Sequence, residues 1–276
     1  MRAQQADSYQ RASLPIYNLP EMRASNAAFW HAIRFELLRQ GVKNVPAALS
    51  FDRPPVPSEI GRDTLFTQVC GYPLQTIYRG QAKLLGAPIY AVEQCSNATH
   101  GGVFIVHRDA GFEQLTDLRG CRFVYNSRYS NSGMNLPRRS IADIAGGKPF
   151  FGSITETHSQ PGNIERVARG EADATCVDCV TYAFFRRHRP TLGELTRVLA
   201  VTPPSPSIPF VTSSEAPDDL KVCLQKALLS VARCAEWADV RAGLMLLDIV
   251  PIDAPNYAVQ LQYEEEAREL GYAELQ

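Results

Sequence analysis

Small polar side chains and a glycine gather in one short stretch, Arg122–Met134, where an apolar segment ends and a helical pattern begins. They are Asn126, Ser127, Ser130, Asn131, Ser132 and Gly133. A strand that runs through such a loop into a helix presents hydroxyls and unpaired backbone N–H groups at the positive end of the helix dipole. Those groups suit an anion. An ordinary helix cap needs one Ser or Asn, so the pattern favours a ligand-contacting loop over a plain cap.

Two more polar segments follow predicted strands. Thr157–Ser159 comes after an extended stretch and contains His158, and Asp178 ends the strand predicted over Ala172–Val177. Ligands of open α/β sheets bind at the carboxyl ends of strands, so both residues are candidates for the same site. The alternatives are a surface histidine that caps a turn, and an N-cap for the helix predicted over Cys179–Arg187.

Strands alternate with helices along the whole chain, which predicts an α/β fold. The character of the sequence changes near residue 96, and a proline-rich connector follows residue 201. We therefore expect two lobes with two interlobe crossings and a ligand cleft. Lobe 1 is discontinuous, over residues 1–95 and 201–276, and lobe 2 is inserted, over residues 96–200.

The spacing of Phe29, Ile33 and Leu37 predicts a helix that Gly41 closes. Val45–Phe51 is predicted as a strand. The end of the chain is predicted to be helical over three stretches, Leu220–Val231, Trp237–Leu247 and Tyr257–Leu270.

The 276 residues are 45% apolar and carry a net charge of −1. This composition is typical of a globular protein and gives no general attraction to nucleic acid. No apolar run is long enough to span a membrane, so we expect no membrane insertion. The first residues contain no hydrophobic segment of the signal-peptide kind.

Seven cysteines are an odd number, and mostly buried free thiols favour a reducing compartment. Cys176-Val-Asp-Cys179 matches C-x-x-C, but no second pair completes a zinc site. The pair also lies at a strand-to-helix junction rather than in a thioredoxin-like context. We predict no metal site and no cofactor.

Four segments together resemble one known family, the phosphate/phosphonate-type solute-binding proteins of ABC importers, which have the type 2 periplasmic binding fold. They are C-G-Y-P-L at Cys70–Leu74, the N-S-x-x-S-N-S-G loop, T-H-S, and G-E-A-D-A-x-x-x-D at Gly170–Asp178. The resemblance covers about residues 12–250.

The resemblance implies that the serine-rich loop grips an anionic head group, with a histidine and an acidic residue nearby. The implied ligand-binding residues are Tyr17, Gln68, Tyr72, Asn126, Ser127, Ser130, Asn131, Ser132, Gly133, His158 and Asp178. In phosphonate binders an acidic residue near the histidine can hold an amino group of the ligand. The loop reads S-N-S-G where such binders carry S-T-S-G, so Asn131 replaces a hydroxyl donor with an amide. The family also implies a disulfide between Cys70 and Cys95.

The predicted function is to bind a small phosphonate, phosphate or similar oxyanion compound for an ABC permease, without catalysis and as a monomer. The family role implies a periplasmic location, which the missing signal peptide puts in doubt. One alternative is a cytosolic enzyme on the same fold, similar to menaquinone-pathway enzymes or thiamine-pyrimidine synthases, with His158 and Asp178 as acid–base partners. Another is a ligand-sensing domain with an exposed apolar patch for a protein partner.

Overall fold

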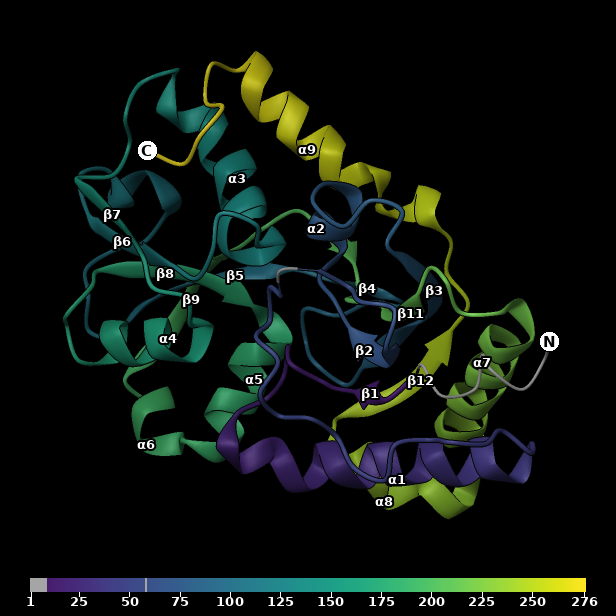
Figure 1. The fold of residues 1–276 in the computed structure, drawn as a ribbon. Coiled ribbons are helices and arrows are strands. Elements are labelled where there is room, and N and C mark those ends of the chain that lie inside the picture. The colour runs from purple at the N-terminus through teal and green to yellow at the C-terminus, as the bar shows by residue number, and fades with distance from the viewer. Residues whose placement is uncertain (1–8, 58) are drawn as a thin grey trace. The chain divides into compact units, whose positions relative to one another are not determined.

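The computed structural model describes residues 9–57 and 59–276, which form two compact units (Figure 1). Unit 1 consists of the described residues up to Ala91, together with Ser96–Ala98 and Pro206–Asn256. Unit 2 consists of Val92–Cys95, Thr99–Ser205 and Tyr257–Gln276. Each unit contains a five-stranded sheet of its own and several helices. The amino-terminal residues 1–8, where a signal segment was sought, lie outside the described residues.

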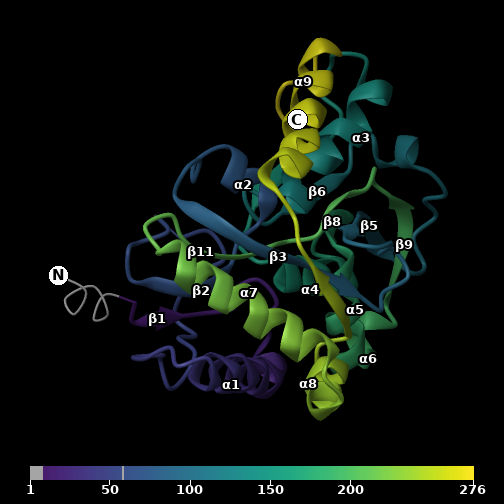
Figure 2. The ribbon, with the colours of Figure 1, turned by 90° about the vertical axis from the view of Figure 1, so that its right-hand side faces the viewer.

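Unit 1 is built on a sheet with the strand order β1-β2-β11-β3-β12. The strands are β1 (Arg11–Ala12), β2 (Thr64–Gln68), β3 (Ala82–Tyr90), β11 (Phe210–Ser213) and β12 (Leu246–Val250). The helices are η1 (Pro20–Met22), α1 (Arg23–Arg39), α2 (Gly71–Gln75), α7 (Asp218–Arg233), η4 (Ala235–Trp237), α8 (Ala238–Gly243) and η5 (Ala254–Tyr257). Figure 2 shows α7 beside α1, and α7 also packs on β3 and β12.

Aromatic side chains fill the space between α1 and the unit 1 sheet. The Phe66 ring lies 5.6 Å from the Trp30 ring and 5.4 Å from the Phe210 ring, measured between centroids. Phe29, Ile33 and Leu37 are fully buried, as their spacing predicted. Gly41 follows α1 with a φ of +82°, a conformation that glycine adopts without strain, which confirms it as the residue that closes the helix.

Unit 2 is built on a sheet with the strand order β7-β6-β8-β5-β9. The strands of this sheet are β5 (Gly102–His107), β6 (Arg122–Tyr125), β7 (Ser153–Glu156), β8 (Ala174–Asp178) and β9 (Thr196–Val201). A separate short strand, β4 (Thr99–His100), pairs with β10 (Ser205–Pro206), which spans the unit boundary. The helices are η2 (Leu115–Leu118), η3 (Asn131–Asn135), α3 (Leu136–Ala145), α4 (Gln160–Ala168), α5 (Cys179–His188), α6 (Pro190–Gly193) and α9 (Ala258–Glu269).

The directions of the unit 2 strands decide what meets at one edge of the sheet. Strands β6, β7 and β8 are parallel, so their carboxyl ends share an edge. Strand β5 is antiparallel to β8, with Gly102 opposite Asp178. The residues that precede β5 therefore reach the same edge as the loops that follow β6, β7 and β8.

The last twenty residues belong to unit 2, whereas the sequence placed them in lobe 1. Helix α9 lies alongside α3 (Figure 1). Ala267 and Tyr272 are fully buried in a core with Phe123 and Phe150. Burial of apolar side chains stabilises a fold by about 2 kcal/mol each, and this gain holds the end of the chain in unit 2.

Two secondary-structure predictions were wrong. Val45–Phe51 forms no strand beyond an isolated bridge between Ser50 and Ser13. The helix predicted over Trp237–Leu247 stops at Gly243, and Leu246–Val250 is strand β12. The apolar spacing of the segment favours a helix, but pairing with β3 stabilises a strand instead, because it buries Leu246 and Ile249.

None of the helices in the part of the chain that is described combines the length and the apolar character needed to cross a bilayer.

The G-E-A-D segment is a structural turn that Arg122 holds. Its guanidinium donates to the carbonyls of Gly170 and Glu171 and to both carboxylate oxygens of Asp173. The Arg122 side chain and backbone N–H both bond Asp173, and the side-chain bond contributes most to lowering the pKa of this carboxyl. The turn thereby fixes the start of β8.

We predict that Asp173→Asn lowers the stability of the protein in a pH-dependent way. Because the folded-state pKa of Asp173 is depressed, its contribution is present above the unfolded value of about 3.9 and is lost as the pH falls through the folded value. Urea denaturation at several pH values checks this. The difference between wild type and variant should be constant at neutral pH and shrink below about pH 4. A difference that grows on acidification would contradict the assignment.

Candidate functional site

The serine-rich loop connects β6 to a helical segment whose first turn, η3, is wide and leads directly into α3. Ser130 is the N-cap, and its Oγ accepts a hydrogen bond from the Gly133 N–H at 3.0 Å. Ser127, Ser130, Asn131 and Ser132 are all buried. The first N–H groups of a helix have no partner within the helix. Those of Asn131 and Ser132 stand at the positive end of the helix dipole, beside the Ser132 hydroxyl.

Gly133 has a steric role in this loop. A Cβ at this position would collide with Oδ1 of Asn126 and would lie 3.1 Å from Oγ of Ser130. Oδ1 of Asn126 is buried and has no hydrogen-bond partner among the described residues. A glycine therefore lets Asn126 lie against the first turn of the helix.

Gln160, the first residue of α4, joins two of the predicted site residues. Its Nε2 donates to Oγ of Ser132 at 3.0 Å, and its Oε1 accepts from the backbone N–H of Asp178 at 3.0 Å. Because Oγ of Ser132 already accepts this bond, its own proton is available to donate to another group. The chain Ser132–Gln160–Asp178 thus crosses the loops that follow β6, β7 and β8.

The Asn131 side chain points into a buried amide network. Its Nδ2 donates to Oγ of Ser205 at 2.8 Å, and its Oδ1 accepts from Nδ2 of Asn135 at 3.0 Å. Gln260 of α9 bonds the same Ser205 hydroxyl. A threonine here would offer a single oxygen in place of the separate donor and acceptor atoms of the amide.

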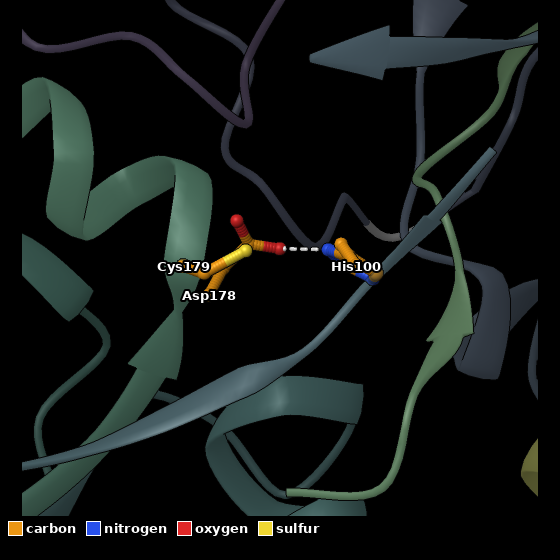
Figure 3. A group of neighbouring side chains, drawn as sticks. All are labelled: His100, Asp178 and Cys179. Atoms are coloured by element: carbon orange, nitrogen blue, oxygen red, sulfur yellow. Dashed lines mark ion pairs between the residues drawn. The ribbon is translucent and has the colours of Figure 1, made fainter. Parts of the chain in front are cut away.

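Asp178 is the N-cap of α5 and also the partner of His100. Its Oδ1 accepts from the backbone N–H groups of Val180 and Thr181, which confirms the N-cap interpretation. Its Oδ2 lies 2.5 Å from Nδ1 of His100, and both side chains are 2% exposed (Figure 3). Burial alone would lower the pKa of His100, but the charge of Asp178 and the hydrogen bond with it outweigh burial and raise this pKa.

His158 is exposed, whereas this pair is buried. Its side chain is 80% exposed, and its Nδ1 lies 3.8 Å from the Glu156 carboxylate. It has a φ of +63° in the turn before α4. The histidine that the structure brings to Asp178 is His100, whereas the contact of His158 with a ligand stays a prediction.

The three site residues predicted in unit 1 lie near the end of β2. Gln68 donates to the carbonyl of Ile208 at 3.0 Å and lies 3.5 Å from the Tyr90 hydroxyl. Tyr17 packs edge-on against Tyr90, with ring centroids 5.6 Å apart. Tyr72 is buried in α2. Tyr90 thus joins Tyr17 to Gln68, and the contact of these residues with a ligand stays a prediction.

No disulfide joins Cys70 to Cys95, and none of the seven cysteines is in a disulfide. The Cys95 sulfur lies 3.6 Å from that of Cys179 instead. Contact with Cys95, and then burial, raise the pKa of the Cys179 thiol well above its usual value. Cys176 belongs to the apolar core, so the C-x-x-C residues do not act as a pair.

Sequence reasoning missed three residues of these clusters, His100, Gln160 and Tyr90. His100 stands before two glycines and an apolar strand, and this H-G-G signal gains meaning only once β5 is known to be antiparallel to β8. A Cβ on Gly102 would lie 3.0 Å from the Cys176 sulfur and 3.3 Å from the Ser132 carbonyl. Close packing at this edge therefore requires the glycine.

Comparison with known families decides the class of the protein. Residues 76–257 match the family described as "ABC transporter, phosphonate, periplasmic substrate-binding protein". The chain belongs to this family. Its members bind substrates for import and are not enzymes, so the chain is a substrate-binding protein and the enzyme alternative fails. Among curated protein sequences, none matches the chain.

Solved structures support the type 2 periplasmic binding fold. A phosphonate-transporter binding protein from Pseudomonas aeruginosa (PA3383) has a TM-score of 0.75 at 14% identity, covering 95% of this chain and 87% of that protein. PhnD1 from Prochlorococcus marinus, in complex with methylphosphonate, has a TM-score of 0.69 at 15% identity, covering 96% and 99%. XAC2383 from Xanthomonas citri, bound to chloride, has a TM-score of 0.69 at 15% identity, covering 95% and 99%.

We predict that Asp178→Asn and Asp178→Ala separate the two roles of this carboxylate. The asparagine keeps an acceptor for the α5 cap but loses the charge opposite His100, and should lower the free energy of unfolding by about 1–3 kcal/mol. The alanine also removes the cap and should cost about 1 kcal/mol more. Urea denaturation in metal-free buffer measures both values. Equal losses in the two variants would show that the cap contributes nothing.

Proposed function

We propose that this chain binds a small oxyanion compound of the phosphonate or phosphate class at the first turn of η3, and delivers it to an ABC permease. The observation that carries the proposal is the buried first turn of η3, which offers the N–H groups of Asn131 and Ser132 and the Ser132 hydroxyl as neutral donors. Oriented dipoles can stabilise an anion without a full countercharge. The family match and the methylphosphonate complex of PhnD1 support the same ligand class.

One cation near this turn, Arg138 of α3, already has partners. It donates to Oδ1 of Asn135 at 2.7 Å and to the carbonyl of Ala273 at 2.9 Å, and Glu264 lies 3.8 Å away. We therefore assign recognition of the anion to the neutral donors rather than to Arg138. Binding of this kind is reversible, as release to a permease requires, and the family role implies that it takes place in the periplasm.

The contacts that Asp178 already makes favour a solute without an amino group. One carboxylate oxygen caps α5 and the other faces His100. A cationic amine on the ligand would have to displace His100 from this carboxylate. We therefore assign Asp178 a supporting role, through Gln160, and expect an alkylphosphonate or phosphate to bind more tightly than an aminoalkylphosphonate.

A thermal-shift titration with phosphate, methylphosphonate and 2-aminoethylphosphonate tests the proposal. A ligand that binds only the folded state stabilises it by about 2.7 kcal/mol at 100 times its dissociation constant. We expect methylphosphonate or phosphate to raise the melting temperature more than the aminated compound at equal concentration. The absence of a shift with all three compounds would contradict the proposed function, and a preference for the amine would contradict the role given to Asp178.

Ser132→Ala should weaken binding of the best anion by about tenfold or more, because it removes a hydrogen bond to a charged group. Ser140→Ala is a matched control, because its hydroxyl lies on α3 and bonds the backbone carbonyl of Leu136 at 2.9 Å. Isothermal titration of both variants measures the dissociation constants. Equal affinities in the two variants would exclude the Ser132 hydroxyl from the site.

A further inference from the structure

Three side chains that can ligate a metal meet at the carboxyl end of β8, and a fourth, Cys95, contacts one of them. Among the described residues, His100, Asp178 and Cys179 offer ligand atoms that all lie within 4.8 Å of one another (Figure 3). The Cys95 sulfur is 3.6 Å from that of Cys179. All four residues belong to unit 2. We propose that they bind a divalent metal ion of the zinc class, with one nitrogen, one oxygen and two sulfur ligands.

The spacing of the two sulfurs fits this proposal. Zinc binds thiolate sulfur at about 2.3 Å with tetrahedral geometry, so two thiolates on one ion lie about 3.8 Å apart. The separation of 3.6 Å between Cys95 and Cys179 is close to that value. Two thiols, an imidazole and a carboxylate form a donor set that suits a borderline-soft ion rather than magnesium or calcium.

The third and fourth ligands come from the His100–Asp178 pair. Nδ1 and Oδ2 lie 2.5 Å apart. Ligand atoms on a tetrahedral zinc lie about 3.3 Å apart, so an entering ion displaces any proton that the two groups share and moves the two atoms apart by less than 1 Å. The Cys95 and Cys179 thiols also lose their protons, and metal uptake therefore releases protons to the solvent.

The position of the group in the fold also favours a metal over an empty cluster. His100 is 2% exposed, so a metal bound to its ring is shielded from water. Two thiolates and a carboxylate around a divalent ion leave one negative charge. Cys179 is the first residue of α5 and Asp178 its N-cap, so the positive end of the helix dipole stabilises that charge. The ion would join Cys95 and His100 to the start of α5.

The test uses the full chain, reduced and stripped of metal with a chelator. Cobalt(II) should bind as a single ion per chain and give the intense sulfur-to-metal absorption of a tetrahedral thiolate site, and zinc should displace it. Cys179→Ser removes one of the two sulfur ligands, so it should reduce this absorption by about half or more and weaken zinc binding by at least about tenfold. Cys234→Ser is the matched control, because it removes an exposed thiol elsewhere, and it should bind as wild type does.

If Cys179→Ser does not fold, His100→Gln tests the site instead, because it leaves both thiols in place. This variant should bind zinc more weakly and keep the thiolate absorption. Reduced wild type without thiolate absorption, or Cys179→Ser with unchanged absorption, would overturn the proposal. A Cys95–Cys179 disulfide that forms in air, with no metal uptake after reduction, would overturn it as well. Anion affinity is measured separately on Cys179→Ser, so that a failure of the metal proposal can be told apart from a failure of the proposed function.

Discussion

The antiparallel pairing of β5 with β8 is the constraint on which the candidate site depends. It places Gly102 opposite Asp178, so that His100 reaches the edge where β6, β7 and β8 end. With a parallel β5, His100 would lie at the opposite edge, and Asp178 would be a buried carboxylate without this partner. A buried charge without a partner is strongly destabilising. The pairing of two strands thereby decides which side chain faces Asp178.

Neutral donors and a carboxylate that already has partners complement each other in this arrangement. An anion at η3 gains from backbone N–H groups and a hydroxyl, and it avoids the repulsion that a free carboxylate nearby would cause. Gln160 ties Ser132 to the backbone of Asp178, so the donors are held in place before a ligand arrives. Donors that are positioned in advance lower the cost of ordering on binding.

Sequence reasoning predicted what local patterns determine. The N-S-x-x-S-N-S-G loop, the helix after it and the cap role of Asp178 all follow from neighbours in the chain, and so does the helix around Phe29. It failed where contacts between distant segments determine the structure. Strand β12 forms because β3 offers a partner, and α9 joins unit 2 because Tyr272 fills its core. Cys95 contacts Cys179 instead of Cys70. His158 resembled the partner of Asp178 because it lies in the next polar loop. Only the direction of β5 shows that His100 takes that place.

The most direct test of the account is a crystal structure of the chain with methylarsonate, an isostere of methylphosphonate whose arsenic atom can be located by its anomalous scattering. We predict the arsenic peak at the first turn of η3, with oxygens in hydrogen-bond contact with the N–H groups of Asn131 and Ser132 and with the Ser132 hydroxyl. An arsenic peak elsewhere, held by Arg or Lys side chains and leaving η3 free, would contradict the account.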